Sequence, residues 1–214
     1  LASELMVKLC GKSLQEFVND ELAIPFGLDL SIGLEFENYT AAAQMIAPES
    51  LIPSDMVNDM DGIQRAALDN PVLHPELPNT DAWRAADIPS ANGFSTAEAL
   101  ATLYGALAGD GCIGGEKLIG MEAVSAATRI QNAASEDRVM KIPAPWSCGF
   151  LRNAMQVYGP SENAFGHSGW GGSFAFADPD NGIGFAYTMN KMGRDLIGDP
   201  RAVALVNALY QDLR

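Results

Sequence analysis

The most constraining feature of this sequence is a pair of apolar runs, 172–177 and 183–189, joined by Asp-Pro-Asp-Asn-Gly at 178–182. Aspartate, proline, asparagine and glycine build tight turns, and apolar runs on both sides of such a turn are typical of a β-hairpin. The sequence therefore predicts an antiparallel sheet near the C-terminus, with a further strand candidate at 148–155. Because two or three strands make a poor sheet, we expect more strands from polypeptide upstream of this chain.

Helix signals account for much of the remaining sequence. Apolar residues at helical spacing, capping motifs or both mark the segments 1–9, 13–25, 59–69, 95–108, 121–131 and 199–213. Two of these segments open with Ser-x-x-Glu, at Ser13 and Ser95, a capping box in which serine and glutamate satisfy each other's backbone amides. The last segment opens with Asp199 and Pro200, residue types preferred at the N-cap and first helical position.

The order of these elements indicates an α+β fold, in which an antiparallel sheet is flanked by helices. Repeated prolines between about 31 and 90 predict an irregular lobe laid over the rest. We expect residues 1–145 to form the mostly helical lobe and irregular segment. We expect residues 146–214 to form the C-terminal antiparallel strands and terminal helix of the same domain.

Composition excludes several classes of function. Thirteen Lys and Arg stand against 27 Asp and Glu, which gives a net charge of −14 and no basic cluster, so no nucleic-acid partner is predicted. No apolar run reaches the roughly 18–20 residues of a membrane span. The three cysteines (Cys10, Cys112 and Cys148) are far apart and the only histidines are His74 and His167. We therefore predict no disulfide framework, no metal and no cofactor.

Two glycine motifs are predicted to be structural. Residues 109–114, Gly-Asp-Gly-Cys-Ile-Gly, match the dinucleotide-binding pattern, but a helix precedes them where that site needs a strand. We expect a helix C-cap followed by a tight turn. Residues 166–170, Gly-His-Ser-Gly-Trp, are similar to a nucleophile elbow. That interpretation is rejected because no histidine follows Ser168 and the next predicted element is a strand.

The stretch His-Ser-Gly-Trp-Gly-Gly at 167–172 comes directly before the predicted hairpin. Together with Gly-Lys-Ser-Leu-Gln-Glu-Phe at 11–17, Ile-Pro-Phe-Gly-Leu at 24–28 and the capped segment 90–107, it resembles the serine β-lactamase, penicillin-binding-protein and esterase superfamily. There, a Lys-Thr-Gly or His-x-Gly triplet lies on an edge strand beside the active site, and Trp-Gly-Gly looks like the esterase-type branch of family VIII carboxylesterases and class C β-lactamase-like proteins. The resemblance covers nearly the whole chain and implies a β-lactamase/transpeptidase-like fold.

The resemblance also implies a chemistry, acyl transfer through a serine ester, with a small ester, amide or β-lactam as substrate. Two residues would be catalytic: the backbone N–H of Trp170 would bind the oxyanion, and His167 would stand where other members place a lysine. Neutral imidazole attracts a substrate carboxylate less than lysine does, which favours neutral esters. Taken alone, His167 also fits a hydrogen-bonding role at a strand start. The predicted substrate-binding residues are Ser168, Gly169, Gly171 and Gly172.

Three other candidates have simpler interpretations. Ser90 and Asn92 form a Ser-x-Asn triplet ahead of a capped helix, where loop and cap duty is expected. Trp83 and Trp146 are expected to pack in the interior, with a wall of an acyl pocket as the alternative.

The nucleophile of this superfamily is the serine of Ser-x-x-Lys, and no lysine of this chain has serine three residues before it. The family's tyrosine motif is not found either. Both precede the matched region in the family, so we expect them upstream and expect this chain alone to be inactive. The alternative is a non-catalytic module that binds a ligand or partner. Separated from its partner strands, the chain is expected to expose apolar sheet surface and self-associate, which makes a homo-oligomer one candidate assembly.

Overall fold

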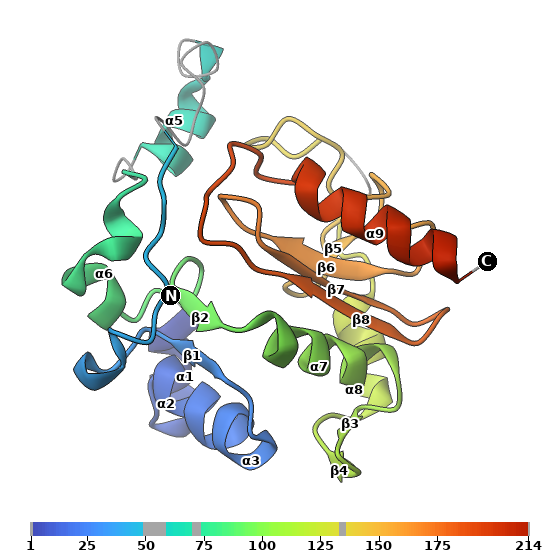
Figure 1. Cartoon of the computed structure of the whole chain (residues 1–214), viewed down its shortest axis with the longest axis horizontal. Coiled ribbons are helices and arrows are strands. Elements are labelled where there is room, and N and C mark those ends of the chain that lie inside the picture. The colour runs from blue at the N-terminus through green and yellow to red at the C-terminus, as the bar shows by residue number, and fades with distance from the viewer. Residues whose placement is uncertain (1, 49–58, 70–73, 133–135, 214) are drawn as a thin grey trace.

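The computed structural model describes residues 2–48, 59–69, 74–132 and 136–213 (Figure 1). The elements up to the middle of the chain are α1 (Ala2–Cys10), α2 (Leu14–Val18), the π-helical turn η1 (Asn19–Ala23), α3 (Ile24–Phe26), β1 (Leu30–Ile32), the 3₁₀ turn η2 (Phe36–Asn38), α5 (Gly62–Leu68), the 3₁₀ turn η3 (Leu77–Asn79), α6 (Asp81–Ala85), β2 (Gly93–Ser95) and α7 (Ala97–Ala108). They are followed by β3 (Cys112–Ile113), β4 (Glu116–Lys117), α8 (Met121–Thr128), β5 (Leu151–Arg152), β6 (Phe165–Ser168), β7 (Phe174–Asp178), β8 (Ile183–Tyr187) and α9 (Pro200–Asp212).

The main sheet has the order β5-β6-β7-β8, and every neighbouring pair is antiparallel. The hairpin predicted from the Asp-Pro-Asp-Asn-Gly turn is confirmed as β7–β8, with Phe176 opposite Phe185. Its turn is shaped by the buried Asp178 carboxylate, which accepts hydrogen bonds from the Asp180 amide at 3.0 Å and the Asn181 side chain at 2.8 Å. The third strand candidate, 148–155, is reduced to the two residues of β5, and strand β6 was not among the predicted strands.

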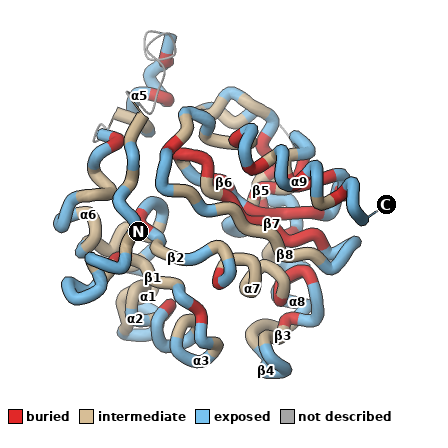
Figure 2. Tube along the Cα trace, in the orientation of Figure 1, coloured by how far each residue is buried: buried red, intermediate tan, exposed pale blue. Residues whose placement is uncertain are grey.

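The two faces of β7 belong to two clusters of the core. Phe174 and Phe176 face α9, where they pack with Val206 and Tyr210. The alternate residue Ala177 packs with α7 and α8 and with Phe165 of β6, as the period of two along a strand requires. Figure 1 shows the sheet between α9 on one side and α7 with α8 on the other, and Figure 2 shows the buried residues gathered along β6 and β7.

The helices lie where the periodicity predicts them, with one correction at a cap. The capping box at Ser13 is confirmed: its hydroxyl accepts from the Glu16 amide at 3.1 Å and the Glu16 carboxylate accepts from the Ser13 amide at 2.7 Å. The box predicted at Ser95 is wrong, because the cap of α7 is Thr96, whose hydroxyl accepts from the Ala99 amide. Ser95 instead pairs with Leu30 in a small sheet of β1 and β2 that local sequence did not predict.

Residues 109–114 form the helix end and turn expected from the sequence. Gly109 is the C-cap of α7, Gly111 has a φ of +78°, and the short β3–β4 hairpin follows. Helix α7, and not a strand, leads directly into these glycines, so they do not have the strand–turn–helix geometry of a dinucleotide site. In the described residues, no helix has both the length and the apolar character to cross a membrane.

Close packing of α7 on β8 depends on a glycine. A methyl group at Gly184 would overlap the main-chain nitrogen of Gly105 and the carbonyl oxygen of Ala101, neither of which moves without moving the helix. A methyl group at Gly105 would meet no atom within 4 Å. The contact is therefore asymmetric: the strand needs glycine and the helix does not.

We expect Gly184→Ala to lower the free energy of unfolding by about 1–3 kcal/mol, the usual effect of overpacking. Gly105→Ala should leave stability unchanged or raise it by about 0.5–1 kcal/mol, because alanine is the better helix former. Denaturant unfolding of the two variants beside the wild type measures both effects. Equal stabilities of the two variants would contradict this packing.

Candidate active site

The predicted site lies where β6 ends and the chain turns into β7. The strand pairing stops at Ser168, opposite Phe174. The turn is closed by a hydrogen bond from the Gly169 amide to the Ser173 carbonyl at 2.8 Å and one from the Gly172 amide to the Gly169 carbonyl at 3.2 Å. Gly171 and Gly172 have φ values of +93° and +110°, which L residues rarely adopt. Residues 169–172 are called the glycine loop below.

The Trp170 amide is one of the donors for which this turn supplies no main-chain acceptor, as are the amides of Gly171 and Ser173. Trp170 lies outside the β6–β7 ladder, and its side chain is half-buried. Among the described residues, no carbonyl accepts a hydrogen bond from its N–H. Unpaired amides are rare where they are shielded from water, so such a group is suited to a ligand oxygen.

His167 is exposed and lies one residue before the end of β6, on the sheet face that carries Ala175. Its ring stacks on Trp146, with centroids 5.6 Å apart and planes inclined by 29°. Its Nδ1 lies 2.8 Å from the Ser168 carbonyl oxygen. A carbonyl oxygen only accepts, so Nδ1 carries a proton and the Nε2 lone pair of the neutral ring is left for another partner.

The structure separates the Ser168 side chain from the rest of the predicted site. Ser168 pairs with Phe174, so its side chain lies on the α9 face, opposite His167. It is buried, and its hydroxyl shares a 3.2 Å hydrogen bond with the hydroxyl of Tyr158. Burial raises the pKa of Tyr158 to about 12, which keeps the phenol protonated at neutral pH. Toward the His167 side, Ser168 contributes its carbonyl oxygen.

One functional neighbour, Asp137, was missed by the sequence analysis. Its carboxylate accepts from the Trp146 indole N–H at 3.0 Å and from the amides of Val139 and Met140 at 2.8 Å each. These bonds, with the Met140 amide the largest cause, lower the pKa of Asp137 below its ordinary value. Asp137 thus fixes the orientation of the Trp146 indole, and the face of the same indole stacks on His167. An aspartate that accepts from the amides two and three residues later forms an Asx-type turn, which local sequence can indicate. Nothing in the local sequence links Asp137 to Trp146.

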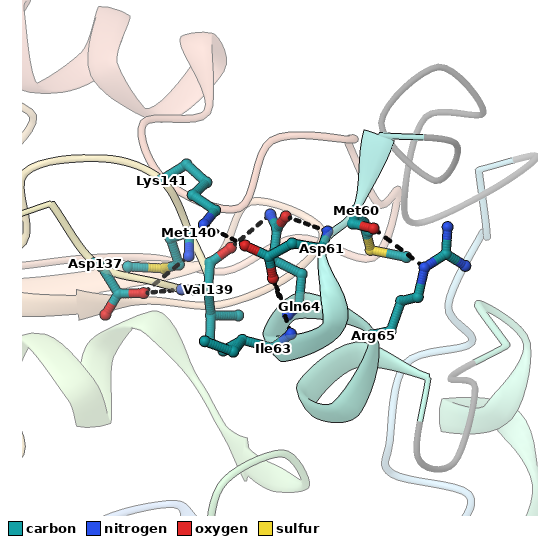
Figure 3. Close-up of polar contacts among 9 residues, drawn as sticks. All are labelled: Met60, Asp61, Ile63, Gln64, Arg65, Asp137, Val139, Met140 and Lys141. Carbon is teal, nitrogen blue, oxygen red and sulfur yellow. Dashed lines mark hydrogen bonds and ion pairs between the residues drawn. The ribbon is translucent and has the colours of Figure 1, made fainter.

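Helix α5 fastens the turn that carries Asp137 (Figure 3). The Lys141 ammonium lies 2.7 Å from the Asp61 carboxylate, and the Gln64 amide donates to the Val139 carbonyl at 2.9 Å. Asp61 is also the N-cap of α5, bonding the amides of Ile63 and Gln64. One carboxylate therefore starts the helix and ties it to the turn beside the site.

The other candidates have structural roles or positions apart from the site. Asn92 is buried and donates to the Trp83 carbonyl at 2.9 Å and to the Ala86 carbonyl, while its side-chain oxygen accepts from the Ile88 amide. This is the loop duty expected for it. Within the part of the chain that the structure describes, no group of three or more His, Cys, Asp or Glu side chains is placed to hold a metal ion.

An antiparallel sheet with its terminal helix on one face, other helices on the opposite face and a glycine loop at the end of one strand defines a β-lactamase/transpeptidase-like domain. A sequence model of the family described as "Beta-lactamase" matches residues 1–208, and the chain belongs to this family.

The relatives are about twice as long as this chain. The chain is 30% identical over 213 residues to "Esterase/beta-lactamase LipL" of Mycobacterium tuberculosis, an alignment that covers 92% of this chain and 47% of LipL. A penicillin-binding protein homolog from Caulobacter crescentus superposes with a TM-score of 0.88 at 39% identity, covering 98% of this chain and 55% of that one. A family VIII carboxylesterase superposes with a TM-score of 0.89 at 36% identity and the same coverage. This chain spans about half the length of these relatives.

We expect Tyr158→Phe to lower the free energy of unfolding by about 0.5–1.5 kcal/mol, because the buried Ser168 hydroxyl loses its hydrogen-bond partner. The matched control is Tyr104→Phe, since the described residues offer the Tyr104 hydroxyl no hydrogen bond; its stability should stay at the wild-type value. Thermal unfolding measures both. If the two variants lose the same stability, Ser168 is not held by Tyr158.

A second expectation concerns Asp61, whose pKa is lowered from 3.8 to about 2, first by the Lys141 hydrogen bond and then by amides at the start of α5. Because the folded pKa is the depressed one, the contact contributes stability above pH 3.8 and loses it as pH falls toward 2. A ¹³C-detected titration of the Asp61 carboxyl should have its midpoint near 2. The midpoint should rise in Lys141→Met but stay below 3.8, because the cap amides remain. An unchanged midpoint in that variant would exclude the ion pair in solution.

Proposed function

We propose that this chain is the C-terminal portion of a serine hydrolase that acts on small esters, or related amides and β-lactams, through an acyl-enzyme. In this proposal it contributes the strand end whose amide binds the oxyanion. The observation that carries the proposal is the Trp170 N–H, which lies beyond the strand ladder without an acceptor among the described residues and three positions from an exposed histidine.

The reaction needs such a donor at the moment charge develops. A serine oxygen bonds to the ester carbonyl carbon as its proton passes to a base, and the carbonyl oxygen takes the negative charge. The Trp170 N–H donates a hydrogen bond to this negatively charged oxygen, and the loop holds the donor in place before the reaction begins. Collapse of the intermediate expels the alcohol, which takes up a proton, and water then hydrolyses the serine ester.

The nucleophile is assigned to polypeptide outside these 214 residues. No lysine of this chain has serine three residues before it, and the chain corresponds to about half of each of its relatives. The Ser168 hydroxyl is not a substitute, because it is buried against Tyr158 on the face opposite His167.

His167 is assigned to the substrate side of the site. With Nδ1 donating to the Ser168 carbonyl, Nε2 of the neutral ring is left as a hydrogen-bond acceptor on an exposed residue. A neutral ring offers little attraction to an anionic substrate, which supports neutral esters as the preferred class. The carboxylesterase and esterase/β-lactamase named among the relatives support the same class.

The test uses the complete gene product that contains this chain, with p-nitrophenyl butyrate as substrate and a fluorophosphonate as a probe of the nucleophile. We expect turnover and covalent labelling of one serine outside the chain. Trp170→Pro removes the amide proton and should lower kcat by about 100- to 1,000-fold, the effect of losing one oxyanion donor. Trp170→Ala keeps the amide and should retain most of kcat.

The outcomes distinguish a hydrolase from a binding module and test the role of the Trp170 amide separately. Absence of both turnover and label in the folded wild-type protein contradicts the enzyme and favours a module that only binds a ligand or partner. Turnover with equal kcat in the proline and alanine variants contradicts the role of the Trp170 amide while leaving the hydrolase in place. Thermal unfolding of both variants shows whether the proline change acts on the loop or on the whole fold.

A further inference from the structure

We propose that Asp199 and Arg201 are positioning residues that hold the glycine loop, and with it the Trp170 amide, in the conformation that receives the oxyanion. This inference rests on the proposed function. It is carried by a set of contacts that join the start of α9 to the loop, 30 residues earlier in the chain.

Arg201 is held in two directions at once. Its Nε and one terminal nitrogen donate to the two oxygens of Asp199, at 3.0 and 2.7 Å, which is the paired geometry that fixes a guanidinium plane. The same terminal nitrogen also reaches the Gly171 carbonyl at 3.1 Å, and the other donates to the Lys191 carbonyl at 2.8 Å. The arginine therefore bridges the glycine loop and the segment that precedes α9.

The Gly171 carbonyl is fixed by two donors. Besides Arg201, the Gly193 amide donates to it at 2.7 Å. The Gly171 carbonyl shares its peptide group with the Gly172 N–H, which donates to the Gly169 carbonyl at 3.2 Å. The Gly169 carbonyl in turn shares its peptide group with the Trp170 N–H. A rotation that turns the Trp170 amide away would therefore have to break the hydrogen bond between Gly172 and Gly169. The two hydrogen bonds to the Gly171 carbonyl oxygen use both of its lone pairs, which leaves the Gly171–Gly172 peptide group a single orientation.

Asp199 supports the same loop from behind. Its side chain is only 2% exposed, and a methyl group at Gly172 would overlap its carboxylate. It is also the N-cap of α9, with Oδ1 accepting from the Arg201 amide at 2.9 Å. The Arg201 hydrogen bond is the main cause that lowers the pKa of Asp199, so this carboxylate stays ionised at neutral pH. A buried anion thus lies directly against the glycine loop and is neutralised by the arginine that grips it.

The segment before α9 that Arg201 binds, residues 190–192, is also hydrogen-bonded to Ile46 of the N-terminal lobe. The Ile46 amide donates to the Asn190 carbonyl at 2.7 Å, and the Met192 amide donates to the Ile46 carbonyl at 3.0 Å. These bonds form a parallel bridge between Ile46 and Lys191, the residue whose carbonyl Arg201 binds. Because the segment is held on both sides, removal of the arginine should free the loop more than the segment.

The experiment measures Arg201→Met in the complete gene product with p-nitrophenyl butyrate. We expect kcat to fall about 10- to 100-fold with little change in KM, because a misplaced donor affects the transition state and not ground-state binding. Arg201→Lys should recover part of the loss, since an ammonium can reach one carbonyl but cannot form the paired contact with Asp199. Lys117→Met, at the exposed β3–β4 hairpin, removes the same charge and should keep the wild-type kcat.

Hydrogen exchange supplies a readout that does not depend on turnover. Amides of residues 169–173 should exchange faster in Arg201→Met than in wild type, while those of β7 and β8 stay unchanged. Slower turnover with unchanged loop exchange, or equal kcat in Arg201→Met and wild type, overturns the inference. A general loss of protection in β7 and β8 as well would also overturn it, because the arginine would then support the fold and not the loop. Absence of turnover by the wild-type protein contradicts the proposed function instead. In that case, hydrogen exchange in Arg201→Met and wild type still tests whether Arg201 holds the glycine loop.

Discussion

Backbone pairing between β6 and β7 stops at Ser168 and Phe174, and the five residues between them, 169–173, form a turn outside the ladder. This single boundary gives the candidate site its donor. Two residues more of regular pairing would bring Trp170 into the ladder, opposite Gly172. The positive φ values of Gly171 and Gly172 prevent that continuation, because they bend the chain away from the strand direction.

Hydrogen-bonded carboxylates stabilise the loops on both sides of this boundary, and two of them, Asp178 and Asp199, are buried. Asp137 binds two backbone amides and the Trp146 indole, and Asp199 binds a helix-start amide and Arg201. Asp178 does the same for the hairpin turn, where it also accepts from the Tyr210 hydroxyl at 2.5 Å. Burying a charge is unfavourable unless it is hydrogen-bonded or paired, so the buried Asp178 and Asp199 each specify one loop conformation. Part of the negative charge of this chain, whose net charge is −14, therefore lies on aspartates that hydrogen-bond and stabilise its loops.

Local signals predicted the longer helices and the β7–β8 hairpin, but not strand β6, the small β1–β2 sheet or the exact ends of the elements. The turn at 178–182 and the cap at Ser13 were correct because each depends on a few adjacent residues. The cap at Ser95 was wrong by one residue because its pairing with Leu30, 65 positions away, draws it into a strand. The opposite orientation of His167 and Ser168 follows from the alternation of side chains in a strand, a signal that was present in the sequence and was not used.

The sequence by itself determined the hairpin, the capped helices, the glycine loop and the membership in a hydrolase family, since these depend on short-range stereochemistry or on motifs in order. Only the tertiary structure decided which groups meet around the loop. Three of these contacts join residues 21 to 80 positions apart: Trp146 stacks on His167, Asp61 of α5 pairs with Lys141 of the Asp137 turn, and Arg201 donates to the Gly171 carbonyl. No periodicity or spacing encodes such contacts, because they arise from packing of whole elements onto the sheet.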